Sequence, residues 1–218
     1  ATHTPWEPAS PSGWIIRDSL SGLIHPKGAC MALVQALAVK GVRIDAEGPD
    51  LGPVLWATGV AGLLDMTANH SRAVGNGVKG QAALLAHDAR GLPQLFAGGV
   101  HVIPHGDGTV AVGSTSERDY TSPNLTDTQL DDVISAARSA VPALDDAPVI
   151  ARWAGVRPRS RSRAPMLGPW PGKSGHFIAN GGFKIGFGMA PKIAEVMADL
   201  MLEARDTIPD GFRIEDNF

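Results

Sequence analysis

The segment FIANGGFKIGFG, residues Phe177 to Gly188, sets the architecture of this chain. It starts as a short apolar strand at 177–180, passes through glycines and enters a helix. The apolar stripe of that helix is formed by Ile193, Val196, Met197, Leu200 and Met201. A strand that turns through glycines into a helix points free backbone N–H groups and the positive helix end at whatever lies above the turn. We therefore predict an anion or cofactor cradle here, with a glycine-rich connection that serves packing alone as the alternative.

Helix and strand signals alternate upstream of this segment. Apolar residues at helical spacing predict a helix from Gly28 to Lys40, and its stripe is Cys30, Leu33, Val34 and Leu37. Cys30 is expected on this face as a buried, inert thiol. Short strands are expected at 14–17, 42–44 and 53–59, the last of them buried and ending in a glycine turn.

The segment 78–116 is typical of an antiparallel sheet. Strand signals at 82–85, 95–96, 101–103 and 110–112 are separated by Gly, Pro and Asp clusters. His105–Gly108, which reads HGDG, is a hairpin-turn signature between two of them. Thr126 and Gln129 form a capping box ahead of an amphipathic helix that Pro142 closes, and a further strand is expected at 149–155.

Composition narrows the class of protein. The chain has 218 residues, 44% of them hydrophobic, and a net charge of −3, so it can build a core and has no global positive field to attract nucleic acid. One cysteine cannot form an intrachain disulfide, which fits a reducing, cytoplasmic setting. Because no apolar run approaches about 18 residues, a membrane partner is not expected. The protein is expected to be soluble.

Arg157 is the strongest candidate for binding a substrate anion. It stands at a predicted strand end in Trp153–Pro158, where Pro158 opposes a helical continuation. An arginine held this way can grip a carboxylate with two hydrogen bonds, although an exposed ion pair is the simpler alternative. The four neighbouring arginines at 152, 159, 161 and 163 would suit an RNA-binding loop, but Trp153 is the one aromatic residue among them, so they lack the repeated interleaved aromatic residues for stacking.

Metal and acyl-transfer chemistry find little support in the sequence. The seven histidines include no HxH, HxxxH or HExxH pair on a single helix, so no metal site is predicted. The Gly-x-Ser-x-Gly turn of many hydrolases is absent as well.

The order of these segments resembles the D-amino-acid oxidase and glycine oxidase-like family of FAD-dependent oxidoreductases over nearly the whole chain. The matching blocks are Ile24–Lys40 with its His25-Pro26 turn, Gly41–Ile44 followed by Ala57-Thr58-Gly59, Lys79-Gly80-Gln81, His101–Thr115, Trp153–Pro158 with Ala164–Gly168, and Asn180–Pro191. Each block alone is weakly specific. Their occurrence in the family's order makes the resemblance specific.

The resemblance implies an α+β fold, in which a mixed antiparallel substrate-domain sheet with flanking helices accompanies part of an FAD-binding three-layer α/β domain. It divides the chain into a loose N-terminal arm at 1–13, a partial FAD-binding domain at 14–72 and 174–205, a substrate-binding domain at 73–173 and a peripheral tail at 206–218.

The same resemblance implies roles for particular residues. Arg157 would anchor a substrate carboxylate, Lys184 would lie where the family usually has an arginine near flavin and substrate, and His101 would replace a substrate-contacting tyrosine. The expected cofactor-binding residues are Thr58, Gly59, Gly181, Gly182, Phe183, Lys184, Ile185, Gly186 and Phe187. The implied reaction moves a hydride from the carbon bearing a neutral amine, in a small amine or amino acid, to the flavin, and the resulting imine hydrolyses in water.

Two departures from the family's pattern affect the cofactor. No Gly-x-Gly-x-x-Gly fingerprint, which would hold the FAD pyrophosphate, opens the chain, and no small β-meander follows Ile44. Gly182 also takes a position that is often a histidine in relatives. We therefore expect an N-terminal FAD-binding segment, in cis or in trans, to complete the protein, and this chain alone to be inactive. A non-catalytic module that binds a small carboxylate or a protein is the alternative.

Overall fold

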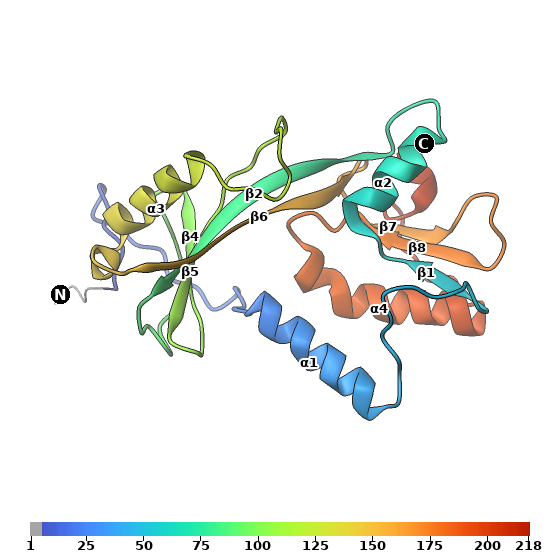
Figure 1. Cartoon of the computed structure of the whole chain (residues 1–218), viewed down its shortest axis with the longest axis horizontal. Coiled ribbons are helices and arrows are strands. Elements are labelled where there is room, and N and C mark those ends of the chain that lie inside the picture. Colours follow the sequence, from blue (N-terminus) through green and yellow to red (C-terminus); the bar gives the residue numbers. More distant parts are fainter. Residues whose placement is uncertain (1–5) are drawn as a thin grey trace. The chain divides into compact units, whose positions relative to one another are not determined.

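The computed structural model describes residues 6–218, which form two compact units (Figure 1). Unit 1 comprises the chain up to Val42 together with Lys79–Gly155, and unit 2 comprises Arg43–Val78 and Val156–Phe218. The expected grouping of 14–72 with 174–205 differs from these units, chiefly because 14–42 belongs to unit 1. That functional division into domains stays a prediction.

Unit 1 is built on a five-stranded sheet with the order β3-β4-β5-β2-β6. Its strands are β2 (Gly75–Ala86), β3 (Leu95–Ala97), β4 (Val100–Pro104), β5 (Thr109–Gly113) and β6 (Val149–Ser160), of which β2 and β6 extend into unit 2. β4 and β5 pair antiparallel from His101↔Gly113 to Pro104↔Val110, so 105–108 is the hairpin turn that the sequence predicts. The four strands predicted at 82–112 and the strand at 149–155 are confirmed.

Helix α3 (Gln129–Ala140) covers this sheet with the apolar face that its periodicity predicts. Leu130, Val133, Ile134 and Ala137 are buried in one cluster with residues of β2, β4 and β5. The predicted capping box is wrong, because Thr128 is the N-cap and its side chain accepts no capping hydrogen bond. The Asp127 carboxylate instead accepts the Gln129 N–H at 3.0 Å. A short 3₁₀ turn, η1 (Pro142–Leu144), follows α3.

The N-terminal arm, expected to be loose, is attached to unit 1 over its described part. Trp6 is 5% exposed within the α3 cluster and its indole N–H donates to the Pro93 carbonyl at 2.9 Å. The Ala9 N–H donates to the Ala140 carbonyl. Residues 1–5 of the predicted arm lie outside the described residues. The strands predicted at 14–17 and 42–44 are wrong, because both segments are irregular.

Helix α1 (Pro26–Val39) forms where the periodicity predicts a helix, but the expected burial of its stripe is wrong. None of its residues, all within the described part of the chain, is buried. Leu33 is 64% exposed and Cys30 is exposed as well. Periodicity identifies the apolar face of a helix, yet burial requires a partner surface.

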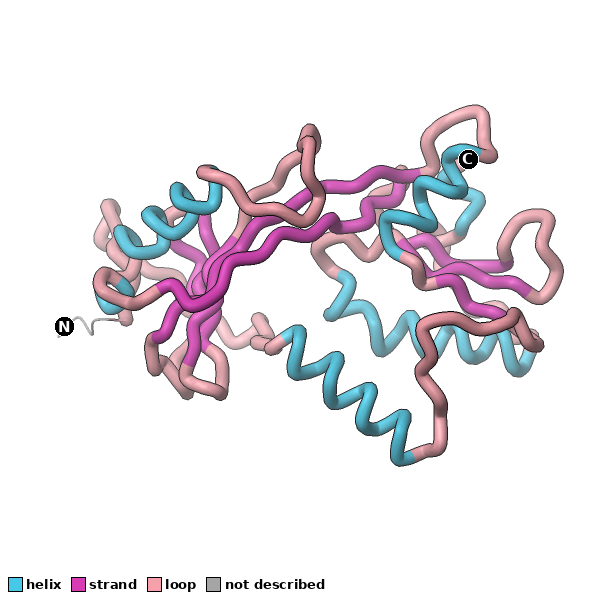
Figure 2. The backbone as a smooth tube through the Cα atoms, in the orientation of Figure 1, coloured by secondary structure: helices cyan, strands magenta, loops and turns pink. Residues whose placement is uncertain are grey.

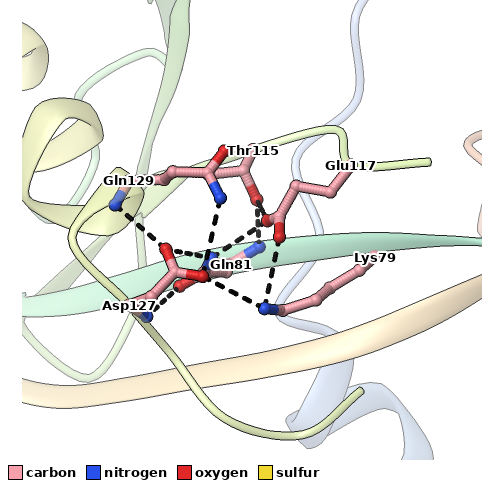
Figure 3. Close-up of polar contacts among 6 residues, drawn as sticks. All are labelled: Lys79, Gln81, Thr115, Glu117, Asp127 and Gln129. Atoms are coloured by element: carbon pink, nitrogen blue, oxygen red, sulfur yellow. Dashed lines mark hydrogen bonds and ion pairs between the residues drawn. The ribbon is translucent and has the colours of Figure 1, made fainter. Parts of the chain in front are cut away.

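A buried polar network joins β2 to the segment 115–127 (Figure 3). The Gln81 amide donates to Glu117 Oε1 at 3.0 Å and to Asp127 Oδ1 at 2.9 Å, and its oxygen accepts the Asp127 N–H at 2.8 Å. Lys79 Nζ, on a side chain only 3% exposed, lies 3.2 Å from Glu117 Oε2 and 3.4 Å from Asp127 Oδ2. The Thr115 hydroxyl donates to Glu117 and accepts the Gln81 N–H. These contacts satisfy polar groups that would otherwise be costly to bury.

The network keeps its members charged. Burial opposes the charge on Lys79, but Glu117 and Asp127 together hold the pKa of that amine above its ordinary value. Burial likewise disfavours the Glu117 carboxylate, yet hydrogen bonds from Thr115, Gln81 and Lys79 keep its pKa below the ordinary 4.5. The hydrogen bond from Gln81 is the main cause of the lowered pKa of Asp127.

Unit 2 contains a second sheet, β1 (Val54–Trp56), β8 (His176–Asn180) and β7 (Met166–Pro169), drawn as three neighbouring strands in Figure 2. α2 (Gly59–Ala68) and η2 (Ile214–Asn217) pack on one face, where Leu63, Ile178 and Ile214 share a buried cluster. α4 (Gly186–Glu203) packs on the other face, where Val196 and Met197 cluster with Leu167. Unit 2 is therefore a three-layer α/β arrangement.

The tail at 206–218, expected to be peripheral, is part of this core. Ile208 and Ile214 are buried, and the Leu167 N–H donates to the Phe212 carbonyl at 2.8 Å. The strand at 177–180 and the helix after it are confirmed, and the strand predicted at 53–59 is shortened to β1 with Leu55 exposed. Among the described residues, no helix is long and apolar enough to cross a membrane.

We expect Glu117→Gln to lower the stability of unit 1 and to flatten its dependence on pH. Stability from a carboxylate with a lowered pKa is fully present above its ordinary value of 4.5 and is lost as pH falls through the folded-state pKa. Urea unfolding at neutral pH and over a series of acidic pH values measures both effects. Asp119→Asn, a change to an exposed carboxylate in the same loop, is the control. Equal midpoints and equal pH slopes for the Glu117 variant and wild type would contradict the role of the network.

Candidate cofactor-binding site

Two strand-to-helix turns meet at one edge of the sheet in unit 2. β1 and β8 pair in parallel from Val54↔His176 to Trp56↔Ile178, so both strands end at the same edge. β1 leads through Thr58 into α2, and β8 leads through 181–185 into α4. Neither helix has a side-chain cap on its first turn. The free N–H groups and positive ends of two helices therefore lie along one sheet edge, an arrangement suited to an anionic group or a cofactor.

Asn180 links the two turns. Its side-chain nitrogen donates to the Gly59 carbonyl at 2.8 Å, across 121 positions of sequence, and its side-chain oxygen accepts the Gly181 N–H at 2.7 Å. The residue is 7% exposed, so these bonds form away from solvent. Because each turn is tied to the same side chain, Asn180 fixes the spacing between the starts of α2 and α4.

Backbone geometry in the second turn demands glycine. Gly181 has φ +75°, a left-handed conformation, and a Cβ there would lie 2.7 Å from the Ser160 Cβ. A Cβ on Gly182 would lie 3.0 Å from the Gly186 Cα. The Phe183 N–H donates to the Pro158 carbonyl at 3.0 Å, which attaches the turn to the end of β6. Close packing against β6 therefore sets the path of the chain from Gly181 to Phe183.

Open space borders the same turns. Among the described residues, nothing lies within 4 Å of the position that a Cβ would take on Gly59, Gly186 or Gly188. Ile185 is 50% and Phe187 47% exposed beside these glycines. The edge thus offers free N–H groups, apolar side chains and open space beside three glycines.

The predicted basic residues of unit 2 lie close to this turn. Arg157 is half-buried on β6, next to Pro158, whose carbonyl holds Phe183. The Lys184 side chain is exposed, with Nζ 5.5 Å from the centre of the Phe183 ring, and the Arg159 guanidinium lies 5.8 Å from the same centre. Thr58, Gly59, Gly181–Phe187 and Arg157 therefore all belong to one unit.

His101 belongs to unit 1 and lies on β4. Its ring is exposed and packs against Phe96 with ring centroids 4.8 Å apart. Since Arg157 and Lys184 belong to unit 2, its expected role beside the substrate stays a prediction.

Sequence reasoning missed Asn180 and Ser160 as residues that shape this site. An asparagine at the end of an apolar strand, directly before two glycines, is a usable signal because its side chain can bond backbone groups of a turn. Ser160 gives no comparable signal, since its contact with Gly181 depends on tertiary packing.

Parallel strands that lead into two uncapped helices at one sheet edge are typical of cofactor-binding α/β domains. The sequence from residue 4 to residue 200 matches the family described as FAD dependent oxidoreductase. The chain therefore belongs to the FAD-dependent oxidoreductase family of D-amino-acid oxidase type, which agrees with the α+β fold and the resemblance noted above.

Its relatives include glycine oxidases. The chain is 36% identical to glycine oxidase from Pseudomonas aeruginosa, over 61% of this chain and 36% of that protein, and 26% identical to glycine oxidase from Bacillus subtilis, over 88% of this chain and 58% of that protein. It thus spans about a third to three fifths of the length of these relatives. Among solved structures, iminodiacetate oxidase from Chelativorans sp. BNC1 shares the fold with a TM-score of 0.66, at 19% identity over 86% of this chain and 57% of that one.

We expect Gly181→Ala to destabilise unit 2 by about 1–3 kcal/mol, because alanine disfavours the left-handed conformation and its Cβ meets Ser160. Gly186→Ala is the matched control, since open space surrounds that position and alanine favours a helix. Thermal or urea unfolding of the two variants measures the difference. Equal losses of stability in both would rule out the close approach to Ser160 as the cause.

Proposed function

We propose that this chain supplies the flavin-ring and substrate-facing part of an FAD-dependent oxidoreductase that oxidises the C–N bond of a small amino acid. The observation that carries the proposal is the shared sheet edge, where two uncapped helix N-termini and open glycines meet in a chain of this family. A further consideration is that glycine oxidase and iminodiacetate oxidase are both named for amines that carry a carboxylate.

The residues at this edge fit an FAD ring. Gly182–Phe187 would lie against its polar end, where the N-terminus of α4 favours negative charge on the ring. Thr58 and Gly59 would contact the cofactor from the start of α2. The chemistry supplied by bound flavin is acceptance of a hydride from the carbon that bears the neutral amine, and the resulting imine hydrolyses in water.

Arg157 would orient the substrate. A guanidinium offers two parallel N–H donors to a carboxylate, so it fixes both position and direction of the amino acid. Lys184, exposed beside Phe183, would add positive charge near flavin and substrate. These residues bind and orient, which places the amine-bearing carbon for the transfer.

The exposed apolar face of α1 supports the proposal that another segment completes the protein. Met31, Leu33 and Val34 are each about half or more exposed, on a helix that the family resemblance assigns to the FAD-binding domain. A contiguous exposed apolar surface commonly marks an interface. We propose that a nucleotide-binding segment with a Gly-x-Gly-x-x-Gly turn, in cis or in trans, covers it. The single cysteine fits a cytoplasmic location for the complete protein.

Reconstitution tests this function. The chain is produced together with a nucleotide-binding segment that carries the Gly-x-Gly-x-x-Gly turn, and flavin absorbance and oxidation of glycine, N-methylglycine and iminodiacetate are measured. We expect a yellow complex that oxidises at least one of these amino acids. A complex that forms but binds no flavin would contradict the proposed cradle. Heat released by amino acids with the chain alone, and no oxidation by the complex, would favour the non-catalytic module instead.

We expect Arg157→Lys in the complex to raise KM for the amino acid about tenfold or more and to leave flavin absorbance unchanged. Loss of one charge-assisted hydrogen bond weakens substrate binding by about 1.5–3 kcal/mol. Arg161→Lys, a change at an exposed arginine near the end of the same strand, is the control. An Arg157 variant with the KM of wild type would refute the role of this residue as carboxylate anchor.

A further inference from the structure

Three side chains that are far apart in the sequence meet in unit 1. His25 precedes α1, while His105 and Asp107 belong to the turn between β4 and β5. One possible ligand atom from each of the three residues lies within 4.8 Å of the other two. The two imidazole rings are 4.0 Å apart between centroids, and His25 Nε2 lies 3.7 Å from Asp107 Oδ2. None of these side chains takes part in the function proposed above.

Hydrogen bonds orient two of the three groups. The Thr109 hydroxyl donates to Asp107 Oδ1 at 2.6 Å, so its oxygen is left to accept the N–H of His105 Nδ1 at 3.2 Å. This bond places the His105 proton on Nδ1 and the lone pair on Nε2. Asp107 Oδ2 takes no part in the Thr109 bond. In metal sites, a residue outside the set of ligands typically fixes the tautomer of a ligating histidine.

We propose that His25, His105 and Asp107 form a binding site for a zinc-like divalent cation. Two imidazole nitrogens together with one carboxylate suit Zn²⁺, Co²⁺ or Ni²⁺, whereas Mg²⁺ and Ca²⁺ prefer ligand sets made of oxygen atoms. The side chains would close in to metal–ligand distances of about 2.0–2.2 Å. The His25 and Asp107 side chains are 34% and 55% exposed, so water can complete the coordination.

Metal binding would alter the start of α1. His25 Nδ1 accepts the Gly28 N–H at 3.1 Å, which caps the helix and requires the lone pair on Nδ1. Coordination through Nε2 of a neutral imidazole moves the proton to Nδ1, so the cap and the metal bond exclude each other. The cation would therefore replace a local helix cap with a link from His25 to the β4–β5 turn.

Calorimetric titration of the chelator-treated chain with zinc sulfate tests the site. We expect one zinc ion per chain, and affinities at least tenfold weaker for His105→Gln and for Asp107→Asn. His87→Gln is the control, because His87 also lies in unit 1 but stacks on Trp6. Zinc binding that both ligand variants retain, or no binding by wild type, would overturn the proposal.

A second variant distinguishes specific loss of the metal site from a general folding defect. Thr109→Val keeps all three ligands and removes the bond that sets the His105 tautomer, so we expect about 10–100-fold weaker zinc binding with an unchanged circular dichroism spectrum. Cobalt(II) should give visible absorption bands in wild type that the His105 variant loses. A Thr109 variant with wild-type affinity and unchanged cobalt bands in the His105 variant would each count against this assignment.

Discussion

Parallel pairing of β1 with β8 is the constraint on which the candidate site depends. Two parallel neighbours end at the same edge, so the helices that follow them must begin there. Asn180 then fixes how far apart those beginnings lie, by bonding the carbonyl of Gly59 and the N–H of Gly181. The left-handed Gly181 lets the chain leave β8 against Ser160 without a steric clash. The candidate cofactor site thus follows from the sheet topology, and glycine permits the backbone path that this topology requires.

In unit 1, a long irregular segment is held against the sheet. Residues 114–128 have almost no regular structure of their own. Backbone bonds from Lys79 and Gln81 hold Glu117 and Thr115, and the side chains of Lys79 and Gln81 bind Glu117 and Asp127. The same bonds place Asp127 to start α3, whose apolar face covers the sheet. A polar network inside the fold therefore positions the helix that completes the apolar core.

Local patterns in the sequence predict most of the elements, and tertiary packing decides the rest. Gly181–Gly188 and the strand before it predict β8, its turn and α4, because glycine and apolar periodicity act over a few residues. The Asn180 bond to Gly59 and the meeting of His25 with His105 join distant positions, which no spacing rule reveals. The predictions of burial are wrong where burial depends on a partner surface. Helix α1 is amphipathic but uncovered, whereas Ile208 and Ile214, in a polar tail, are buried.

The exposure of Cys30 gives the molecule a built-in position for chemical labelling. The sequence holds one cysteine, and it lies on the uncovered helix α1. A thiol-reactive fluorophore would therefore attach at a single place, on the helix proposed to meet the nucleotide-binding segment. Its rate of attachment would report whether that helix is in contact with water or with another surface, independently of any colour or turnover from a flavin.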